Sequence, residues 1–308
     1  MDHYDSVRED FIEEMETGLI SRGKGEELVY ALEGTGLESF SIKADAGFIY
    51  PSIEMELIYM ELLYQDMEAE DMAENLLGSF DQVVRLPKET VEQVDNVILY
   101  PVNYEKYHKQ LEEKDMAYLL VGDIAVTFQN YYEEEKTYYR SDVTNEHLVK
   151  WGLTPEELYE LTRNRKLENM ETRVESVKDS VNERLGMGIG LMELAPESPD
   201  REVFNVYGLN GIGPVFYPKF MQQIADKLGN ELLIVPSGTY TAFVHSAKEF
   251  EAKSLLEGLN NMNMMHREDG NNRYILSGQI YAYDAQTQKI TLAEGMSLDK
   301  KKPKEMGR

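Results

Sequence analysis

The sequence predicts an α+β fold, in which helices pack on mostly antiparallel sheet. Of its 308 residues, 42% are apolar, and they include 20 Tyr and 10 Phe, which is enough for a substantial core. Segments with helical spacing of apolar residues are mixed with short β-rich segments. Turns at 236–238 and 284–287 join neighbouring strand segments. Because a parallel crossover needs about a dozen residues or more, we expect these strands to pair as antiparallel hairpins.

The N-terminal half is predicted to begin with an amphipathic helix. Apolar residues recur at helical spacing over 4–21, at Val7, Phe11, Met15 and Leu19. A short strand is expected over 40–44, where apolar and polar residues alternate. Residues 51–52 open a strongly apolar helix over 53–64, which we expect to be buried on most sides. The following helix is expected to end at Gly78.

The middle of the chain contains strand signals and one clear helix start. The β-rich segments are 97–102 and 117–132. Thr154 is a good N-cap, Pro155 suits the first helical position, and Glu157 completes a capping box. A charged helix is expected over 170–185 as a link between the two halves.

The C-terminal half is predicted to mix strands with helices. Strands are expected at 191–195, 203–208, 231–236, 239–246, 274–284 and 288–293, and helices at 214–228 and 248–262. A boundary at 186–190 gives two sub-domains and a tail. These are an acidic N-terminal α+β part (1–185), a C-terminal α+β part (186–295) and a flexible basic tail (296–308).

Composition restricts the compartment and the chemistry. The chain contains no cysteine, which excludes disulfides, thiolate nucleophiles and cysteine-ligated zinc. No apolar run approaches the roughly 20 residues of a membrane-spanning helix. The N-terminus is acidic from Asp2, unlike a secretory or mitochondrial leader. We therefore expect a cytoplasmic protein that does not bind membranes.

The charge is strongly negative and unevenly distributed. The net charge is −26, and residues 1–80 contain 20 acidic against 4 basic residues, which accounts for 16 of those charges. Such a surface repels phosphate backbones and anionic lipids, so no direct nucleic-acid binding is expected. One interpretation is an acidic face that binds a basic protein partner or imitates DNA. The other is an ordinary solvated exterior, since charge contributes to solubility in any case.

Two long segments carry a resemblance to a known family. One runs from Phe204 to Leu292 and includes FNVYGLNGIGPVFYPKF and VPSGTYTAFV. The other, over 143–168, contains VTNEHLVKWGLTPEELYELTRNRK. They resemble an uncharacterised bacterial family catalogued as a domain of unknown function, whose layout the YtpQ-like proteins share. The resemblance covers most of 40–293 and is weakest before Thr144. It implies a bacterial origin but no activity.

Glycine clusters at 186–190, 210–213 and 23–25 suggest phosphate binding at first sight. None precedes Lys-Ser or Lys-Thr, and none has dinucleotide-binding spacing, so ordinary turns explain them. The helix start after the second cluster belongs to the pattern shared with the family. The resemblance therefore makes Asn210, Gly211 and Tyr217 candidate ligand-binding residues.

Ser237 is a candidate nucleophile, between Pro236 and Gly238 at a strand end. It is not in a Gly-x-Ser-x-Gly elbow, and as a turn residue it needs no catalytic explanation. The family pattern reads Ser-Ser-Ile-His-Glu at this turn, whereas this chain has Ser-Gly-Thr-Tyr-Thr over 237–241. The missing His and Glu imply that any chemistry they perform in relatives is lost here.

Asp123 and Asn164 are two further catalytic candidates. Asp123 is a carboxylate within a hydrophobic strand segment, where it could act as a base, pair with an arginine or cap a bulge at Gly122. Asn164 matches a recurrent position of the family, although Arg165 replaces the threonine expected after it. Both residues also have ordinary structural explanations.

No metal or cofactor site is predicted from the sequence. No two of the five histidines stand four residues apart on one helical face (His3, His108, His147, His245 and His266). His147 is expected to serve packing or hydrogen bonding, since the first turn of a helix disfavours a positive charge. A metal site built from distant residues stays open.

Three functions remain for comparison with the structure. The first is a non-catalytic interaction or regulatory protein whose acidic N-terminal face binds a basic partner. The second is a hydrolase or transferase that uses Asp123, Asn164 or Ser237 in a cleft between the two halves. The third is a nucleic-acid mimic, which needs carboxylates in phosphate-like rows. The Met and Tyr residues that interrupt the acidic residues over 53–64 argue against it.

Overall fold

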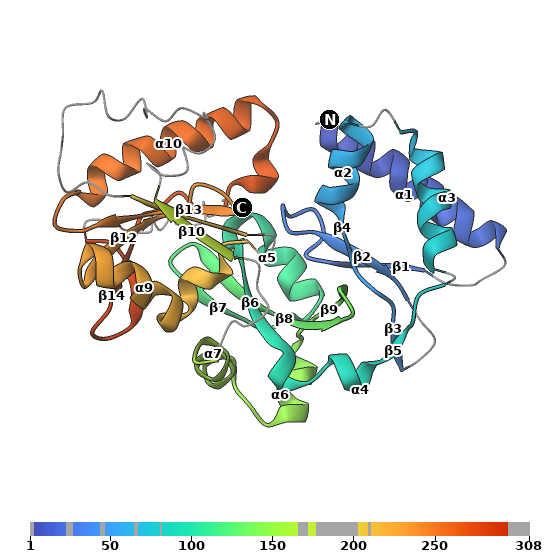
Figure 1. Cartoon of the computed structure of the whole chain (residues 1–308), viewed down its shortest axis with the longest axis horizontal. Helices are drawn as coiled ribbons and strands as arrows, with labels where there is room; N and C mark the ends of the chain where they lie inside the picture. Colours follow the sequence, from blue (N-terminus) through green and yellow to red (C-terminus); the bar gives the residue numbers. More distant parts are fainter. Residues whose placement is uncertain are drawn as a thin grey trace, which may run out of the picture.

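The structure is a computed structural model, and it describes residues 3–22, 27–43, 47–64, 67–80, 82–165, 172–176, 203–208 and 211–294. It confirms the α+β class, with helices packed on antiparallel sheets. N-terminal helices lie at one end of the long axis, the C-terminal sheet lies at the other, and a central sheet lies between them (Figure 1).

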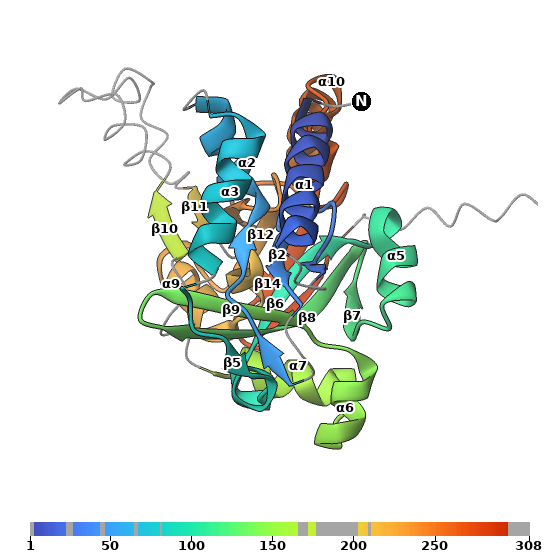
Figure 2. The same cartoon turned by 90° about the vertical axis from the view of Figure 1, so that its right-hand side faces the viewer.

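The N-terminal region combines three helices with a small antiparallel sheet. The strands are β1 (Leu28–Ala31), β2 (Ser39–Ile42) and β4 (Ile53–Glu54), in the order β1-β2-β4. The helices α1 (His3–Ser21), α2 (Met55–Tyr64) and α3 (Ala69–Phe80) stand on one side of these strands (Figure 2). Phe11, Met15 and Leu19 on α1 form a core with Phe40 and Ile42 on β2, as the helical spacing predicted.

Two predictions for this region were wrong in detail. Helix α2 is not buried on most sides, because Leu57, Met60 and Leu63 are exposed by 49%, 39% and 41%. The spacing of these residues places them on one face, opposite the face that carries Met55 and Ile58 into the core. Helix α3 continues past Gly78 to Phe80, since the buried Phe80 ring stacks edge-on against Tyr50.

The central sheet is organised around one long strand. Strand β8 (Ile124–Glu134) pairs with β6 (Val97–Asn103) on one edge and with β7 (Tyr118–Val121) and β9 (Thr137–Asp142) on the other. The strands predicted at 97–102 and 117–132 are confirmed, with a turn at 122–123 dividing the second. Helix α5 (Tyr104–Glu113) follows β6 directly and was not predicted.

Smaller elements surround this sheet. They are β3 (Phe48–Ile49), β5 (Leu86–Pro87), α4 (Lys88–Val91), η1 (Val94–Asn96), α6 (Asn145–Trp151) and α7 (Pro155–Arg163). The capping box predicted for α7 is confirmed. The Thr154 N–H donates to Glu157 Oε2 at 2.9 Å, and the Glu157 N–H donates to Thr154 Oγ1 at 3.2 Å.

The C-terminal sheet has six antiparallel strands in the order β10-β11-β13-β12-β14-β15. They are β10 (Thr172–Ser176), β11 (Phe204–Gly208), β12 (Glu231–Val235), β13 (Thr241–Ser246), β14 (Tyr281–Asp284) and β15 (Lys289–Leu292). The helical elements are η3 (Gly213–Phe216), α9 (Pro218–Leu228), α10 (Ala252–Glu268) and η4 (Asn272–Tyr274). The predicted hairpins β12–β13 and β14–β15 are confirmed.

Both faces of the C-terminal sheet are covered. On β12, Leu232 and Ile234 join a core with η3, α9 and the central sheet, whereas Leu233 and Val235 join a second core with Leu259 of α10. Helices α9 and α10 lie on opposite sides of the strands (Figure 1). A strand buried on both faces is apolar at successive positions, as Leu232–Val235 of β12 is.

Several C-terminal predictions need correction. Residues 172–176 form strand β10 rather than part of a helix over 170–185, because they pair with β11 through five registered positions. Helix α10 starts at Ala252, four residues later than predicted, after a turn that brings Phe250 into the core. The strand expected over 274–284 is confined to β14, because Tyr274 ends the 3-10 helix η4.

The remaining predictions on organisation fall outside the described residues. These are the strand at 191–195, the boundary at 186–190, the rest of 170–185 and the tail at 296–308. The division into two sub-domains therefore stays a prediction. Within the described parts, one core joins Leu99 and Phe128 of the central sheet to Phe204 and Ile234 of the C-terminal sheet. None of the described helices combines the length and apolar character required to cross a membrane.

Candidate functional site

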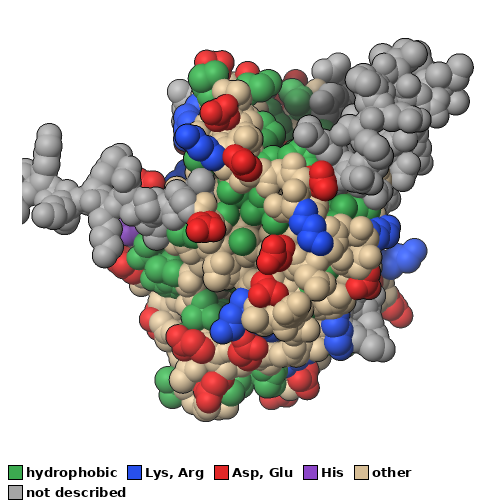
Figure 3. All heavy atoms as spheres, turned by 90° about the vertical axis from the view of Figure 1, so that its left-hand side faces the viewer, with side chains coloured by type: hydrophobic (Ala, Val, Ile, Leu, Met, Phe, Trp, Pro, Cys, Tyr) green, Lys and Arg blue, Asp and Glu red, His purple; other side chains and the backbone are tan. Residues whose placement is uncertain are grey.

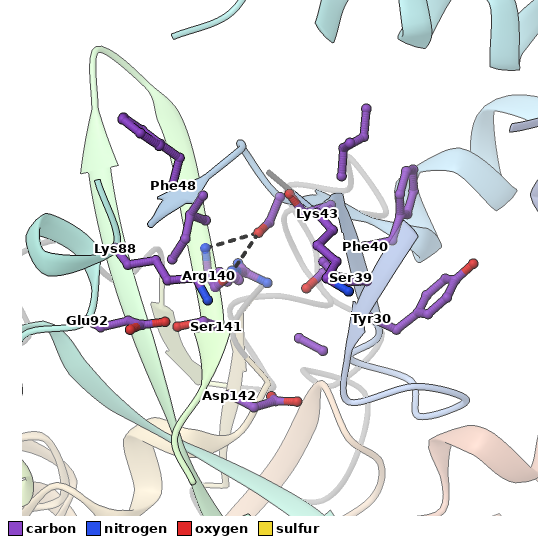
Figure 4. A pocket seen from close by; sticks show the side chains of 16 residues that line it. Tyr30, Ser39, Phe40, Lys43, Phe48, Lys88, Glu92, Arg140, Ser141 and Asp142 are labelled. Carbon is purple, nitrogen blue, oxygen red and sulfur yellow. Dashed lines mark hydrogen bonds between the residues drawn. The ribbon is translucent and has the colours of Figure 1, made fainter. Parts of the chain in front are cut away.

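A cavity of about 510 Å³ lies between the N-terminal sheet and strand β9. Its residues come from β1, β2, β3, α4 and β9, elements far apart in sequence (Figure 4). In that view Lys88 of α4 and Glu92 just after it lie on one side, while Ser39 of β2 and Lys43 just after it lie on the other. The volume is within the range of about 300–1,000 Å³ that is typical of small-molecule sites.

The cavity exists because one face of the N-terminal sheet carries small side chains. On β1 and β2, Tyr30 and Phe40 pack toward the helices. All the residues of 29–31 and 39–42 contribute to the cavity lining, and the positions that alternate with Tyr30 and Phe40 carry Val29, Ala31, Ser39 and Ser41. In register, Val29 pairs with Ser41 and Ala31 pairs with Ser39. Small side chains at these positions fill less of the space between the N-terminal sheet and β9.

Arg140 of β9 forms the opposite wall and is held by several partners. Its Nη2 lies 2.7 Å from Glu54 Oε1, and its guanidinium carbon lies 5.7 Å and 5.4 Å from the ring centroids of Tyr100 and Tyr131. The backbone N–H of Arg140 donates to Ser52 Oγ at 3.0 Å. With its charge neutralised by Glu54, Arg140 stabilises the cavity wall.

The two carboxylates that line the cavity also have partners. The Thr144 N–H donates to His147 Nδ1 at 3.1 Å, so Nε2 carries the ring hydrogen toward Glu92 Oε2, 3.4 Å away. Burial by itself would raise the pKa of Glu92, but the hydrogen bond from His147 outweighs this effect and the pKa is lowered. Asp142 accepts a hydrogen bond from Gln129 Nε2 at 3.1 Å, and burial raises its pKa.

Lys88 is different from these charged groups. Its side chain reaches the cavity from the first residue of α4 and makes no ion pair within the described parts of the chain. Lys43, by contrast, lies at the rim and is 3.0 Å from Glu27 Oε2, where both side chains are largely exposed. Lys88 is exposed and makes no direct ion pair among the described residues, although its charge acts on the nearby Glu92 carboxylate and helps to lower the pKa of that group.

Among the residues predicted from sequence, Asp123 connects two sheets. Its Oδ1 accepts from Ser277 Oγ at 2.5 Å and also from the Tyr281 hydroxyl, and its Oδ2 accepts from the Gly278 N–H at 3.0 Å. Burial, together with the Asp123 carboxylate, raises the pKa of Tyr281, which keeps the phenol protonated as a donor. This network fastens the β7–β8 turn to the segment before β14.

Asn164 and Ser237 are placed away from this network. Asn164 is exposed at the C-terminus of α7, where its Nδ2 donates to the Glu160 carbonyl at 2.7 Å. Ser237 is in the β12–β13 connection, and its Oγ donates to the Thr241 carbonyl at 3.0 Å. The hydrogen bonds of Asp123, Asn164 and Ser237 join none of these three side chains to another.

Two of the candidate ligand-binding residues, Gly211 and Tyr217, lie just before η3 and α9. Asn210 is outside the described residues. Gly211 is buried with φ +65°, and a Cβ there would lie 2.8 Å from the Thr239 carbonyl oxygen, so close packing of two loops requires glycine. Tyr217 is 1% exposed, and its hydroxyl accepts from the Leu99 N–H at 3.1 Å. Gly211 and Tyr217 thus have packing roles inside the core.

A second surface of interest covers α1 and α3. Eight exposed carboxylates lie on these two helices, at Asp5, Glu9, Asp10, Glu13, Glu16, Glu70, Asp71 and Glu74. Arg8 is their one lysine or arginine, and it points inward, with Nη2 2.6 Å from Glu38 Oε1. The face in Figure 3, on the C-terminal side, instead mixes lysine and arginine with acidic side chains. We call the eight carboxylates the acidic surface.

The sequence did not indicate the cavity residues Lys88, Glu92 and Arg140. The one available signal was the alternation of polar and apolar residues around Phe40, which marks a second face of the strand. The opposite wall of the cavity is formed by Lys88, Glu92 and β9, which follow β2 by about 50 to 100 residues. Its position therefore depends on tertiary structure. In the described parts, no group of three or more His, Cys, Asp and Glu side chains is arranged to hold a metal ion.

Comparison with known proteins identifies a family but no activity. No curated protein and no solved structure matches the chain. A family model described as a family of unknown function, DUF5688, matches residues 8–285, which is most of the chain. The match includes the cavity and nearly all of the acidic surface. The chain therefore belongs to the DUF5688 family of unknown function.

Proposed function

We propose that this chain is a non-catalytic interaction or regulatory protein whose acidic surface binds a basic protein partner. It would act in the cytoplasm of a bacterium, as a relative of the YtpQ-like proteins. The observation that carries the proposal is the distribution of charge on α1 and α3. Eight carboxylates are exposed there, while Arg8 is turned away from the surface by Glu38.

The arrangement of the acidic surface favours contact with another protein. Asp5, Glu9, Glu13 and Glu16 lie on one stripe of α1, opposite the stripe that Phe11 and Met15 bury. Such a row of like charges costs stability within a helix, where neighbours four residues apart repel. A basic partner would relieve this repulsion and would be steered to the surface by the electrostatic field.

The exposed apolar face of α2 adds a second element of recognition. Helix α2 packs against α1, so Leu57, Met60 and Leu63 lie on the same helical layer as the acidic surface. Exposed Met and Leu side chains adapt to different apolar partners. We therefore infer that the partner presents basic and apolar side chains together, as an amphipathic helix does.

The catalytic alternative has less support. A hydrolase or transferase would require Asp123, Asn164 and Ser237 to converge on a reacting group. Asp123 is engaged by three donors, and the other two side chains bond to backbone carbonyls of their own turns. These bonds give each of the three a local structural role.

The test is capture of partners from native lysate, followed by mass spectrometry, at about 50 mM and 500 mM salt. The bait is the full chain with Glu9, Glu13, Glu70 and Glu74 changed to Gln, compared with wild type. The matched control changes Glu105, Glu113, Glu257 and Glu268, which are exposed on α5 and α10, to Gln. Both variants change the net charge equally.

We expect wild type and control to enrich the same basic proteins at low salt and to lose them at high salt. The acidic-surface variant should lose them at both. Partners that bind equally at both salt concentrations, or that bind the acidic-surface variant as well as wild type, would contradict the proposal.

A further inference from the structure

We propose that the cavity between β1–β2 and β9 binds a small organic anion, with its charged group on Lys88 and its apolar body on the sheet. This ligand site is separate from the acidic surface, and it does not depend on the protein partner. Three observations on the cavity lead to this chemistry: its charges, its hydroxyl groups and its apolar wall.

The charged groups of the cavity include one lysine, Lys88, that makes no direct ion pair among the described residues. Arg140 pairs with Glu54, Glu92 accepts from His147, and Asp142 accepts from Gln129. Lys88 is exposed and lies near Glu92, but its ammonium group is free to form a charge-assisted contact with an anion in the cavity. Since both carboxylates already have donors, the cavity needs no cationic group from the ligand.

The hydroxyl groups provide a second polar contact. Ser41 Oγ donates to the Tyr50 carbonyl at 3.0 Å, and Ser141 Oγ accepts from Asn130 Nδ2 at 3.2 Å. Ser39 also lines the cavity, and the residue is 1% exposed. A serine hydroxyl both donates and accepts, so Ser39 is a suitable donor to a ligand oxygen.

The apolar wall indicates an organic molecule and not a bare inorganic ion. Val29 and Ala31 on β1 and Phe48 and Ile49 on β3 line the cavity. Val29 and Phe48 are exposed by 41% and 38%, so they lie at the rim and not in a packed core. About 510 Å³ exceeds the space that inorganic phosphate needs. The apolar body of the ligand would cover this wall.

The test uses 8-anilinonaphthalene-1-sulfonate, an aromatic anion, in fluorescence titrations of the full chain. We expect saturable binding that Lys88→Gln weakens about tenfold, the effect of one charged contact. Lys88→Arg should retain binding within about threefold. Val29→Trp, which places a large ring at the rim, should also weaken binding about tenfold. Lys219→Gln is the charge-matched control, because Lys219 is exposed on α9.

The control probes are inorganic phosphate and the neutral N-phenyl-1-naphthylamine. Phosphate should displace the sulfonate only at millimolar concentration, and the neutral probe should bind wild type and Lys88→Gln equally. Thermal unfolding verifies that each variant is folded. The proposal is overturned if Lys88→Gln weakens binding no more than Lys219→Gln does, if Val29→Trp has no effect, or if no saturable binding occurs.

Discussion

The N-terminal and C-terminal sheets differ in what covers their faces. The C-terminal sheet is packed on both sides, by α9 with the central sheet on one face and by α10 on the other. The N-terminal sheet is packed on one side by α1, α2 and α3, and its other side lines the cavity. The C-terminal sheet is therefore covered on both faces, whereas one face of the N-terminal sheet borders a cavity.

This difference is visible in single strands. Each position of β12 from Leu232 to Val235 is buried, so both alternating sets are apolar. On β2 all four positions are buried as well, but Ser39 and Ser41 alternate with Phe40 and Ile42. Burial alone therefore does not separate a core face from a cavity face. The two faces differ in the type and size of their side chains, which are Ser on one face of β2 and Phe and Ile on the other.

The largest effect is expected for Leu232→Ala in the C-terminal sheet. Leu232 is fully buried, and its truncation should lower the free energy of unfolding by about 2–5 kcal/mol. Val29→Ala, at the cavity rim, should cost less than about 1 kcal/mol, since the side chain is 41% exposed. Urea denaturation measures both. Equal losses would remove the distinction between the two sheets.

A smaller effect, which depends on pH, is expected at His245 on β13. Burial lowers the pKa of His245 from 6.5 to about 4, so the folded chain binds fewer protons than the unfolded chain between these values. Stability should therefore fall as the pH is lowered through this window. The loss from this residue is about 2 kcal/mol between pH 7 and pH 5.

The control for this prediction is His245→Leu, which removes the titrating group from the same site beside Phe250. The difference in unfolding free energy between wild type and variant should change by that amount over the same pH range. Parallel pH profiles for the two proteins would show that burial of His245 does not affect stability.

The smallest effect is expected on the acidic surface of the N-terminal region. Glu9 stands four residues from both Asp5 and Glu13 on α1, and all three are exposed. Glu9→Gln should raise the free energy of unfolding by about 0.2–0.5 kcal/mol at low salt, because it removes like-charge repulsion. The gain should disappear in about 1 M NaCl. A loss of stability at low salt would indicate that these charges are not arranged as a repelling row.

Local patterns in the sequence predicted much of the fold. The spacing of Phe11, Met15 and Leu19 predicted α1, and Thr154 with Glu157 predicted the start of α7. These signals depend on neighbours within one or two turns, so they are readable from the chain itself. The strand at 172–176 was mistaken for helix because its pairing with β11 overrides a weak local preference.

The candidate site was predicted much less well. Asp123 is recognisable in the sequence as a carboxylate within a hydrophobic segment, but its donors Ser277, Gly278 and Tyr281 come from about 155 residues further along the chain. Lys88 carried no signal, because a lysine in a short helix is usually solvated. Its position across the cavity from Ser39 results from packing of α4 and β9 against the N-terminal sheet (Figure 4).

The sequence by itself determined the α+β class, the short hairpin connections and the concentration of negative charge in residues 1–80. Each of these depends on composition or on contacts between near neighbours. Only the tertiary structure decided which face of each sheet is covered, that Arg8 turns away from the acidic surface, and that Lys88 faces a cavity. Those features arise where segments distant in sequence meet, and their packing fixes the burial and pairing of each charge.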